Sequence, residues 1–142
     1  MRIFLPLLIF VCLPCLVNAR TLYFVVHPKN VESKITLSKA KKIILKKAEK
    51  WDDGSDIRVF LPNDEIFPIV IRELFGMDKF KWEEYWGKQS LESGKQAPSI
   101  LKSELSIIKN ISKNKKGFGI ITDRKFSNRL KKSIKVILKV EI

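Results

Sequence analysis

Three polar side chains, Asn63, Asp64 and Glu65, separate two apolar runs of the sequence, one ending at Pro62 and the other beginning at Ile66. This order is typical of a strand followed by a helix, whose free N-terminal amides can hold an anion. Two acids at that point would repel an anion, and Asp64 can itself accept hydrogen bonds from the amides as an N-cap. We therefore expect a self-capped helix, with a site for a cation or a neutral solute on Asn63 and Asp64 as the alternative.

Residues 1–19 have the pattern of a secretory signal peptide. Arg2 precedes an apolar core that runs from Ile3 to Val17, and the small residue Ala19 marks a cleavage site before Arg20. The apolar core is short for the roughly 20 residues of a membrane span, although an uncleaved anchor is the alternative. We expect a periplasmic or secreted protein of residues 20–142, without a transmembrane segment once the leader is removed.

The sequence contains few residues that could catalyse a reaction or bind a metal ion. His27 is the only histidine, and both cysteines lie in the predicted leader, so thiol catalysis and cysteine-based metal sites are excluded from the mature chain. The acids that adjoin one another are Asp52-Asp53, Asp64-Glu65 and Glu83-Glu84. Because adjacent side chains on a helix or strand point apart, none of these forms an evident acid–base pair. We expect no enzyme activity, no catalytic residue, no metal and no cofactor, and keep His27 only as a candidate ligand-binding residue.

A lysine-rich stretch at residues 34–47 repeats apolar residues at helical spacing. The expected buried stripe is Leu37, Ala40, Ile43 and Ile44, and the expected water-facing surface is Lys39, Lys41, Lys42 and Lys46. The net charge of the sequence is +13, and such a field attracts anions, nucleic acid or acidic lipid headgroups. We expect a solvated basic surface, with docking on acidic headgroups or an acidic protein patch as the alternative. A secreted location argues against nucleic acid.

The remaining pattern predicts one α/β layer domain over residues 20–142. Strands are expected at 22–26, 57–61, 118–122 and within 133–142, and helices at 34–47, 66–75, after Asp78 and after Ser103, with 90–99 as a loop. The aromatic residues Trp82, Tyr85 and Trp86 share one helix face, so we expect them in the core, with stacking on a sugar or base as the alternative. The last helix is expected to turn Leu105, Ile108 and Ile111 inward.

Three segments resemble, in this order, the phosphate-type (PstS-like) periplasmic solute-binding proteins, and in particular their short, single-lobe members. The segments are ITLSKAKKIILKKAEKWDDGSDIRV, FGMDKFKWEEYWGKQSLESGK and ELSIIKNISKNKKGFGIITD. The resemblance covers most of the mature chain but only one lobe of a two-lobed binder. It implies an α/β fold, namely a single lobe of the type II periplasmic-binding-protein fold, with a small mixed sheet flanked by helices.

The sequence departs from this family where phosphate would bind. Phosphate-binding members place a Ser/Gly/Thr-rich turn, usually with an arginine, where this chain has Asn63, Asp64 and Glu65, and Ile120 stands where tyrosine is usual. The resemblance implies a solute-binding-like protein related to phosphate ABC transporter substrate-binding proteins, with a degenerate phosphate loop, whose partners are a small oxyanion or other solute and a transporter. The alternative is an accessory module that docks on an envelope protein or membrane surface through its basic face.

Overall fold

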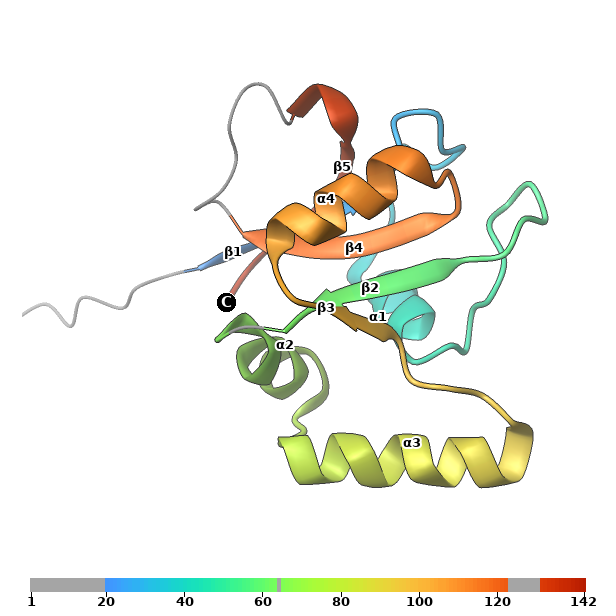
Figure 1. Ribbon diagram of the computed structural model, residues 1–142, viewed down its shortest axis with the longest axis vertical. Helices are drawn as coiled ribbons and strands as arrows, with labels where there is room; N and C mark the ends of the chain where they lie inside the picture. Colours follow the sequence, from blue (N-terminus) through green and yellow to red (C-terminus); the bar gives the residue numbers. More distant parts are fainter. Residues whose placement is uncertain (1–19, 64, 123–130) are drawn as a thin grey trace, which may run out of the picture.

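Five strands and four α-helices follow one another in the computed structural model, which describes residues 20–63, 65–122 and 131–142 (Figure 1). In chain order they are β1 (Thr21–Val26), α1 (Leu37–Ile44), β2 (Arg58–Pro62), α2 (Ile66–Phe75), α3 (Lys79–Ser93), β3 (Ser99–Leu101), α4 (Glu104–Lys113), β4 (Gly117–Thr122) and β5 (Lys135–Glu141). A short 3-10 turn precedes β5. The predicted leader lies outside the described residues and stays a prediction.

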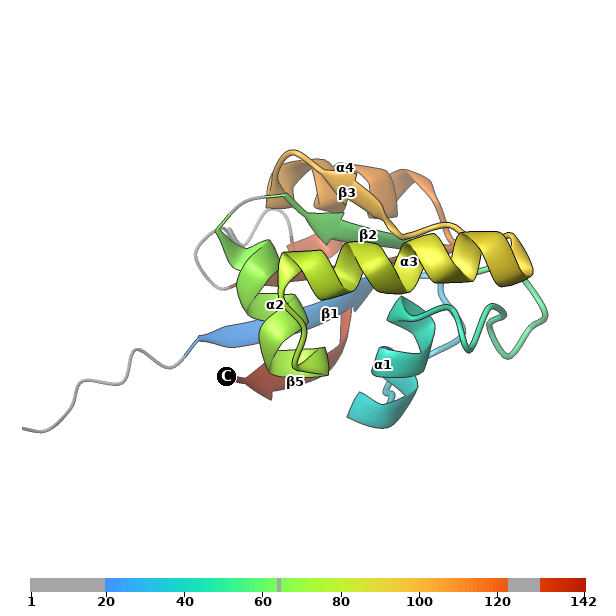
Figure 2. The ribbon, with the colours of Figure 1, turned by 90° about the horizontal axis from the view of Figure 1, so that it is seen from below.

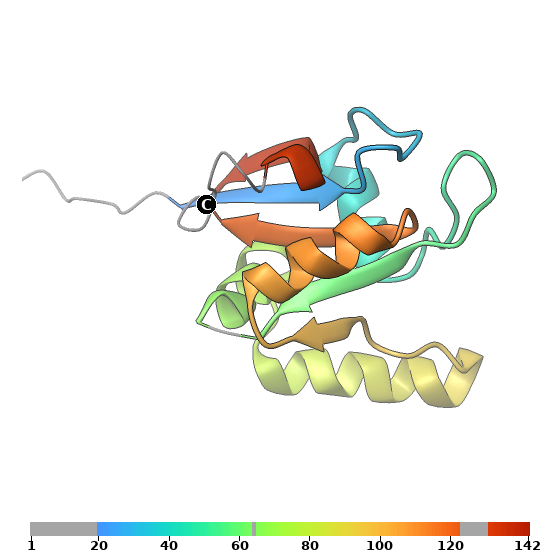
Figure 3. The same cartoon turned by 45° about the horizontal axis from the view of Figure 1, so that its top comes forward.

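The strands form one mixed sheet in the order β3-β2-β4-β1-β5. The strand β2 pairs in parallel with both β3 and β4, whereas β1 is antiparallel to β4 and to β5 (Figure 3). The small mixed sheet that the family resemblance implied is therefore confirmed.

Side chains of the central strands alternate between two hydrophobic cores, as the two-residue period of a strand requires. Leu22 and Phe24 of β1 face the larger core, which also receives α1, α2 and α3. Val25 and Ile121 face the smaller core beneath α4. The helices α1 and α2 thus cover one face of the sheet and α4 covers the other, as Figures 1 and 2 show.

Gly119 of β4 lets α4 approach the sheet closely. A Cβ atom at this position would lie 2.5 Å from Ile107 Cγ2 and 2.8 Å from Ile111 Cδ1, distances that real side chains do not tolerate. The close packing of α4 on the sheet therefore explains why this chain has glycine at position 119.

The helix boundaries follow the capping signals of the sequence. Thr36 accepts a hydrogen bond from the Lys39 amide at 3.1 Å, and Asp78 accepts one from the Lys81 amide at 2.8 Å. The helix α2 ends at Gly76, whose left-handed φ of 63° suits glycine. Trp82 and Trp86, 3% and 5% exposed, lie in the core as expected.

Two expected boundaries were wrong. The first helix ends at Ile44 rather than near residue 47, because Lys46 has a left-handed φ of 55° that reverses the chain. The expected loop at 90–99 contains the last residues of α3 and the first residue of β3, which the sequence analysis missed. The strand β3 has only three residues, Ser99–Leu101, which is too short a stretch for an alternating pattern to predict a strand.

Candidate functional site

The parallel strands β2, β3 and β4 end side by side at Pro62, Leu101 and Thr122, and we call this border of the sheet the carboxyl edge (Figure 3). The helices α2 and α4 begin just beyond it, with Glu65 and Ser103 as their N-cap residues. Ligands of open α/β sheets bind outside the carboxyl ends of the strands. The topology therefore makes the carboxyl edge the candidate ligand site.

Glu104 is a buried carboxylate at this edge, with only 2% of its surface exposed. Its Oε1 accepts a hydrogen bond from the Thr122 backbone N–H at 2.9 Å and another from the Thr122 hydroxyl at 2.7 Å. A buried carboxylate is costly unless it is hydrogen-bonded, and these two bonds provide compensation. They also occupy two donors that a ligand at the end of β4 could otherwise use.

The position of Glu104 in the core was not predicted, because the sequence pattern indicated that Leu105 faces inward. That expectation was wrong, since Leu105 is 42% exposed while Glu104, Ile107 and Ile111 are buried. The buried positions 104, 107, 108 and 111 have the spacing of one helix face. This spacing was present in the sequence, but a glutamate next to apolar residues normally indicates the end of a buried stripe and not a member of it.

The start of α2 presents polar groups to solvent. Asn63 is exposed, and its backbone N–H donates to the Leu101 carbonyl at 2.7 Å, which extends the pairing of β2 with β3. Glu65 is also exposed and makes no capping hydrogen bond with its side chain. Asp64 lies outside the described residues, so the expected capping of α2 by Asp64 stays a prediction.

His27 follows β1 and lies at the opposite edge of the sheet, because β1 runs antiparallel to β4. Val26 pairs with Phe118 and Leu22 with Thr122, which places His27 roughly 16 Å from the carboxyl edge at about 3.3 Å per residue. Its Nδ1 accepts a hydrogen bond from the Lys29 amide at 3.0 Å. The structure therefore does not bring His27 and Asn63 into one site.

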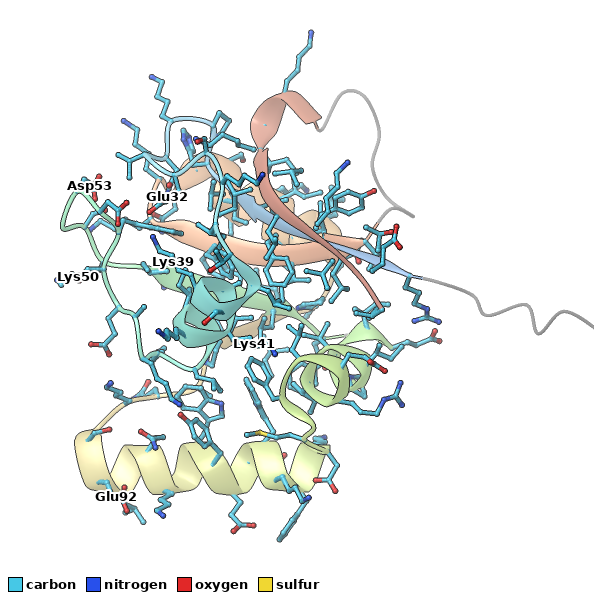
Figure 4. All side chains as sticks on the ribbon, turned by 180° about the vertical axis from the view of Figure 1, so that it is seen from behind. Glu32, Lys39, Lys41, Lys50, Asp53 and Glu92 are labelled. Atoms are coloured by element: carbon cyan, nitrogen blue, oxygen red, sulfur yellow. The ribbon has the colours of Figure 1, made fainter. Side chains whose placement is uncertain are left out.

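The four lysines of the predicted basic surface do not form one uniform face. Lys39 was expected to face water, but its Nζ lies 2.6 Å from the buried Glu32 carboxylate and 3.5 Å from that of Asp52 (Figure 4). The hydrogen bond to Glu32 raises the pKa of Lys39, against the lowering effect of burial. Lys42 is exposed, whereas Lys41 and Lys46 are half-buried.

Two further features bear on the kind of site. Within residues 20–63, 65–122 and 131–142, no three histidine, cysteine, aspartate or glutamate side chains form a group that could hold a metal ion. Over the same residues, no helix has the length and apolar character of a membrane span.

The chain has the fold of a single lobe of a type II periplasmic binding protein, and solved structures of phosphate-binding proteins share this fold. PstS from Borrelia burgdorferi matches with a TM-score of 0.60 and 17% sequence identity, over 84% of this chain and 47% of that protein. An ABC-type phosphate transport receptor from Vibrio cholerae matches with a TM-score of 0.54 and 13% identity, over 84% and 46%.

A third match is a Clostridium perfringens protein described as a phosphate ABC transporter substrate-binding protein and solved with bound phosphate. It has a TM-score of 0.55 and 14% identity, over 84% of this chain and 44% of that protein. The chain thus spans less than half the length of the solved proteins that it matches. No protein-family model matches the sequence, and no curated protein matches it significantly. The predicted resemblance is confirmed at the level of the fold.

Proposed function

We propose that this chain is a periplasmic or secreted solute-binding-like lobe, related to the substrate-binding proteins of phosphate ABC transporters, whose phosphate loop is degenerate. The proposal rests chiefly on one observation, the single-lobe fold shared with phosphate-binding proteins. The carboxyl edge is the proposed ligand site, and binding rather than catalysis is the proposed activity. The predicted signal peptide supports the location.

The charges at the carboxyl edge argue against phosphate. Glu65 and Glu104 lie at the starts of the two helices that border the edge, and Glu104 already accepts from both donors of Thr122. A phosphate about 4 Å from a carboxylate would meet a repulsion of roughly 4 kcal/mol per unit charge at a surface dielectric near 20. One charge-assisted hydrogen bond returns only about 1.5–3 kcal/mol. Lys102 at the same edge is exposed, so solvent screens its attraction.

The same groups suit a solute that donates hydrogen bonds. The exposed amide of Asn63 and the exposed carboxylate of Glu65 present acceptor oxygens beside the end of β2. A neutral polyhydroxylated solute or an organic cation has the complementary donors. Enclosing such a ligand requires a second wall, which we propose comes from another copy of the chain or from a transporter partner.

A ligand panel tests this proposal. The purified protein would be titrated at low salt with phosphate, sulfate, neutral sugars and organic amines, with melting temperature and binding heat as readouts. We expect a sugar or an amine, rather than phosphate, to raise the melting temperature. The variant Asn63→Ala should remove this shift, whereas Asn110→Ala on α4, also an exposed asparagine, should preserve it. The proposal fails if no member of the panel has an effect at millimolar concentration, or if phosphate binds most tightly.

A second function, docking through the basic face, is favoured by a separate observation. Among the described residues, Lys41 and Lys42 take part in no ion pair, so their charges are available to an acidic partner. The double variant Lys41→Glu and Lys42→Glu should then abolish association with envelope proteins or acidic membranes in co-sedimentation. An unchanged association would exclude this function.

A further inference from the structure

A groove of about 370 Å³ lies between α1 and the end of α2, away from the carboxyl edge. Its apolar lining consists of Leu37, Leu45 and Phe75, and its charged lining consists of Lys41, Lys42 and Lys47. We call this feature the lysine groove. Figure 2 shows α1 and α2 on the same face of the sheet, and Figure 4 shows Lys41 on α1.

The local structure of α1 explains how lysines and leucines come to line one groove. Leu37, Lys41 and Leu45 are four residues apart, so their side chains follow one ridge of the helix. The left-handed turn at Lys46 then folds the chain back, and the Lys47 amide donates to the Lys42 carbonyl at 2.8 Å. This turn brings a third lysine next to the last turn of the helix.

Phe75 forms the opposite wall and is held in place by its neighbours. It is the last residue of α2, and its ring lies 6.0 Å from that of the buried Trp82. Leu37, Leu45 and Phe75 are only half-buried. The groove therefore keeps apolar surface accessible instead of closing over it.

The ion pairs of the structure bear on the charge of the groove. Among the described residues, Lys41, Lys42 and Lys47 take part in no ion pair, whereas Lys39 and Lys95, which do not line the groove, pair with carboxylates. Three positive charges around an apolar lining create a local field that attracts an anion. A ligand that neutralises the lysines and covers the apolar lining would satisfy both features together.

We propose that the lysine groove binds one small anionic amphiphile, with its head group on the lysines and its apolar body against Leu37, Leu45 and Phe75. The volume falls within the range of about 300–1,000 Å³ that is usual for small-molecule sites. This site is separate from the carboxyl edge and does not depend on the solute-binding function proposed for that edge.

A single molecule fits better than a membrane surface. The most exposed apolar side chains among the described residues are Phe80 and Leu91 on α3, at 73% and 91%. The exposed lysines of that helix, Lys79, Lys81 and Lys88, are balanced by the exposed acids Glu83, Glu84 and Glu92, so its apolar side chains have no net positive charge beside them to attract an anionic bilayer. The groove thus combines apolar surface and positive charge in one concave site, whereas binding to a bilayer requires both on one flat face.

The test ligand is decyl phosphate below its critical micelle concentration. Two comparison ligands each carry one half of it: inorganic phosphate has only the charged head group, and decanol has only the apolar chain. Calorimetry should show one saturable site for decyl phosphate, with affinity about tenfold or more above that of either half. Replacing both Lys41→Gln and Lys42→Gln should weaken binding about tenfold through loss of charge-assisted contacts. Ser38→Trp, at an exposed position of the groove lining, should block binding by filling the space.

The matched control carries Lys109→Gln and Lys113→Gln, two exposed lysines of α4 on the other face of the sheet. It removes the same charge and should leave binding unchanged, and circular dichroism verifies that each variant is folded. The proposal is overturned if the control pair weakens binding as much as the groove pair, or if Ser38→Trp has no effect. Association with anionic vesicles but not with monomeric decyl phosphate would also overturn it, in favour of membrane docking.

Discussion

Glu104 joins the start of α4 to the end of β4 through the two hydrogen bonds that its Oε1 accepts from Thr122. Removing the carboxylate leaves a buried N–H and a hydroxyl without this partner, and each such loss costs about 1–3 kcal/mol. We expect Glu104→Ala to lower the free energy of unfolding by about 2–4 kcal/mol in urea denaturation. The exposed Glu83→Ala should change it by less than about 0.5 kcal/mol. Equal effects of the two substitutions would contradict this role.

Lys39 gives a prediction about pH. Its hydrogen bond to the Glu32 carboxylate raises its pKa above the ordinary 10.5. Because the folded pKa is the higher one, the contribution of this pair to stability is present below pH 10.5 and is lost as the pH rises through the folded pKa. We expect Glu32→Gln to lower the pKa of Lys39, measured by NMR titration of its side-chain methylene next to Nζ. A pKa that does not move would exclude Glu32 as the cause.

Residues with local roles were predictable from the sequence, and residues with distant partners were not. Asp78 and Ser103 were expected to precede helices, and each accepts a capping hydrogen bond from an amide three residues ahead. The partner of Glu104 is 18 residues away in β4, and that of Lys39 lies on a loop before the helix. Local spacing cannot identify such partners, because the sheet topology brings them together.

At the scale of elements, the close contact between α4 and β4 depends on Gly119, which has no side chain. Gly119→Ala should force Ile107 and Ile111 to shift, which we expect to cost about 1–3 kcal/mol of unfolding free energy. Gly87→Ala is the matched control, because Gly87 lies within α3 and an added Cβ there meets no atom within 4 Å. This control should stabilise the protein by about 0.5–1 kcal/mol through helix propensity. If both substitutions act alike, the close packing of α4 is not the reason for Gly119.

The join between β2 and α2 gives a gain-of-function prediction. Replacing Asp64→Gly together with Glu65→Thr removes two acids from the sequence and introduces the residue types that the family resemblance associates with phosphate binding. We expect this variant to bind phosphate saturably in calorimetry at low salt, where the parent chain does not, since two repulsive charges are removed. The double variant Glu83→Gln and Glu84→Gln makes the same change of charge on α3 and should have little effect. An equal gain in both variants would indicate a general change of field instead of a local one.

Long periodic elements were predicted more reliably than short ones. The helix α2 and strand β4 combine buried apolar residues with clear ends, and both were predicted to within a residue. The three-residue β3 was missed because its order comes from pairing with β2 and not from its own residues. The early end of α1 depends on a left-handed lysine, a conformation that lysine rarely adopts and that no residue pattern indicates.

At the scale of the whole molecule, the order of elements and the family-like segments were enough to predict the lobe. The distribution of sites around it was not predictable. His27 and Asn63 both follow a predicted strand and were both candidate ligand-binding residues, yet the antiparallel direction of β1 places them at opposite edges. Likewise, the lysines near α1 were predicted to form one basic surface, but in the structure Lys39 forms an ion pair with Glu32 and Lys41 lines a groove.

Titration of the isotope-labelled protein with phosphate, followed by backbone amide NMR at low salt, tests most directly whether this lobe has lost its phosphate site. We predict no saturable shift changes at the starts of α2 and α4 up to millimolar phosphate, because Glu65 and Glu104 are positioned there. Saturable changes centred on those amides, with a submillimolar dissociation constant, would contradict the account.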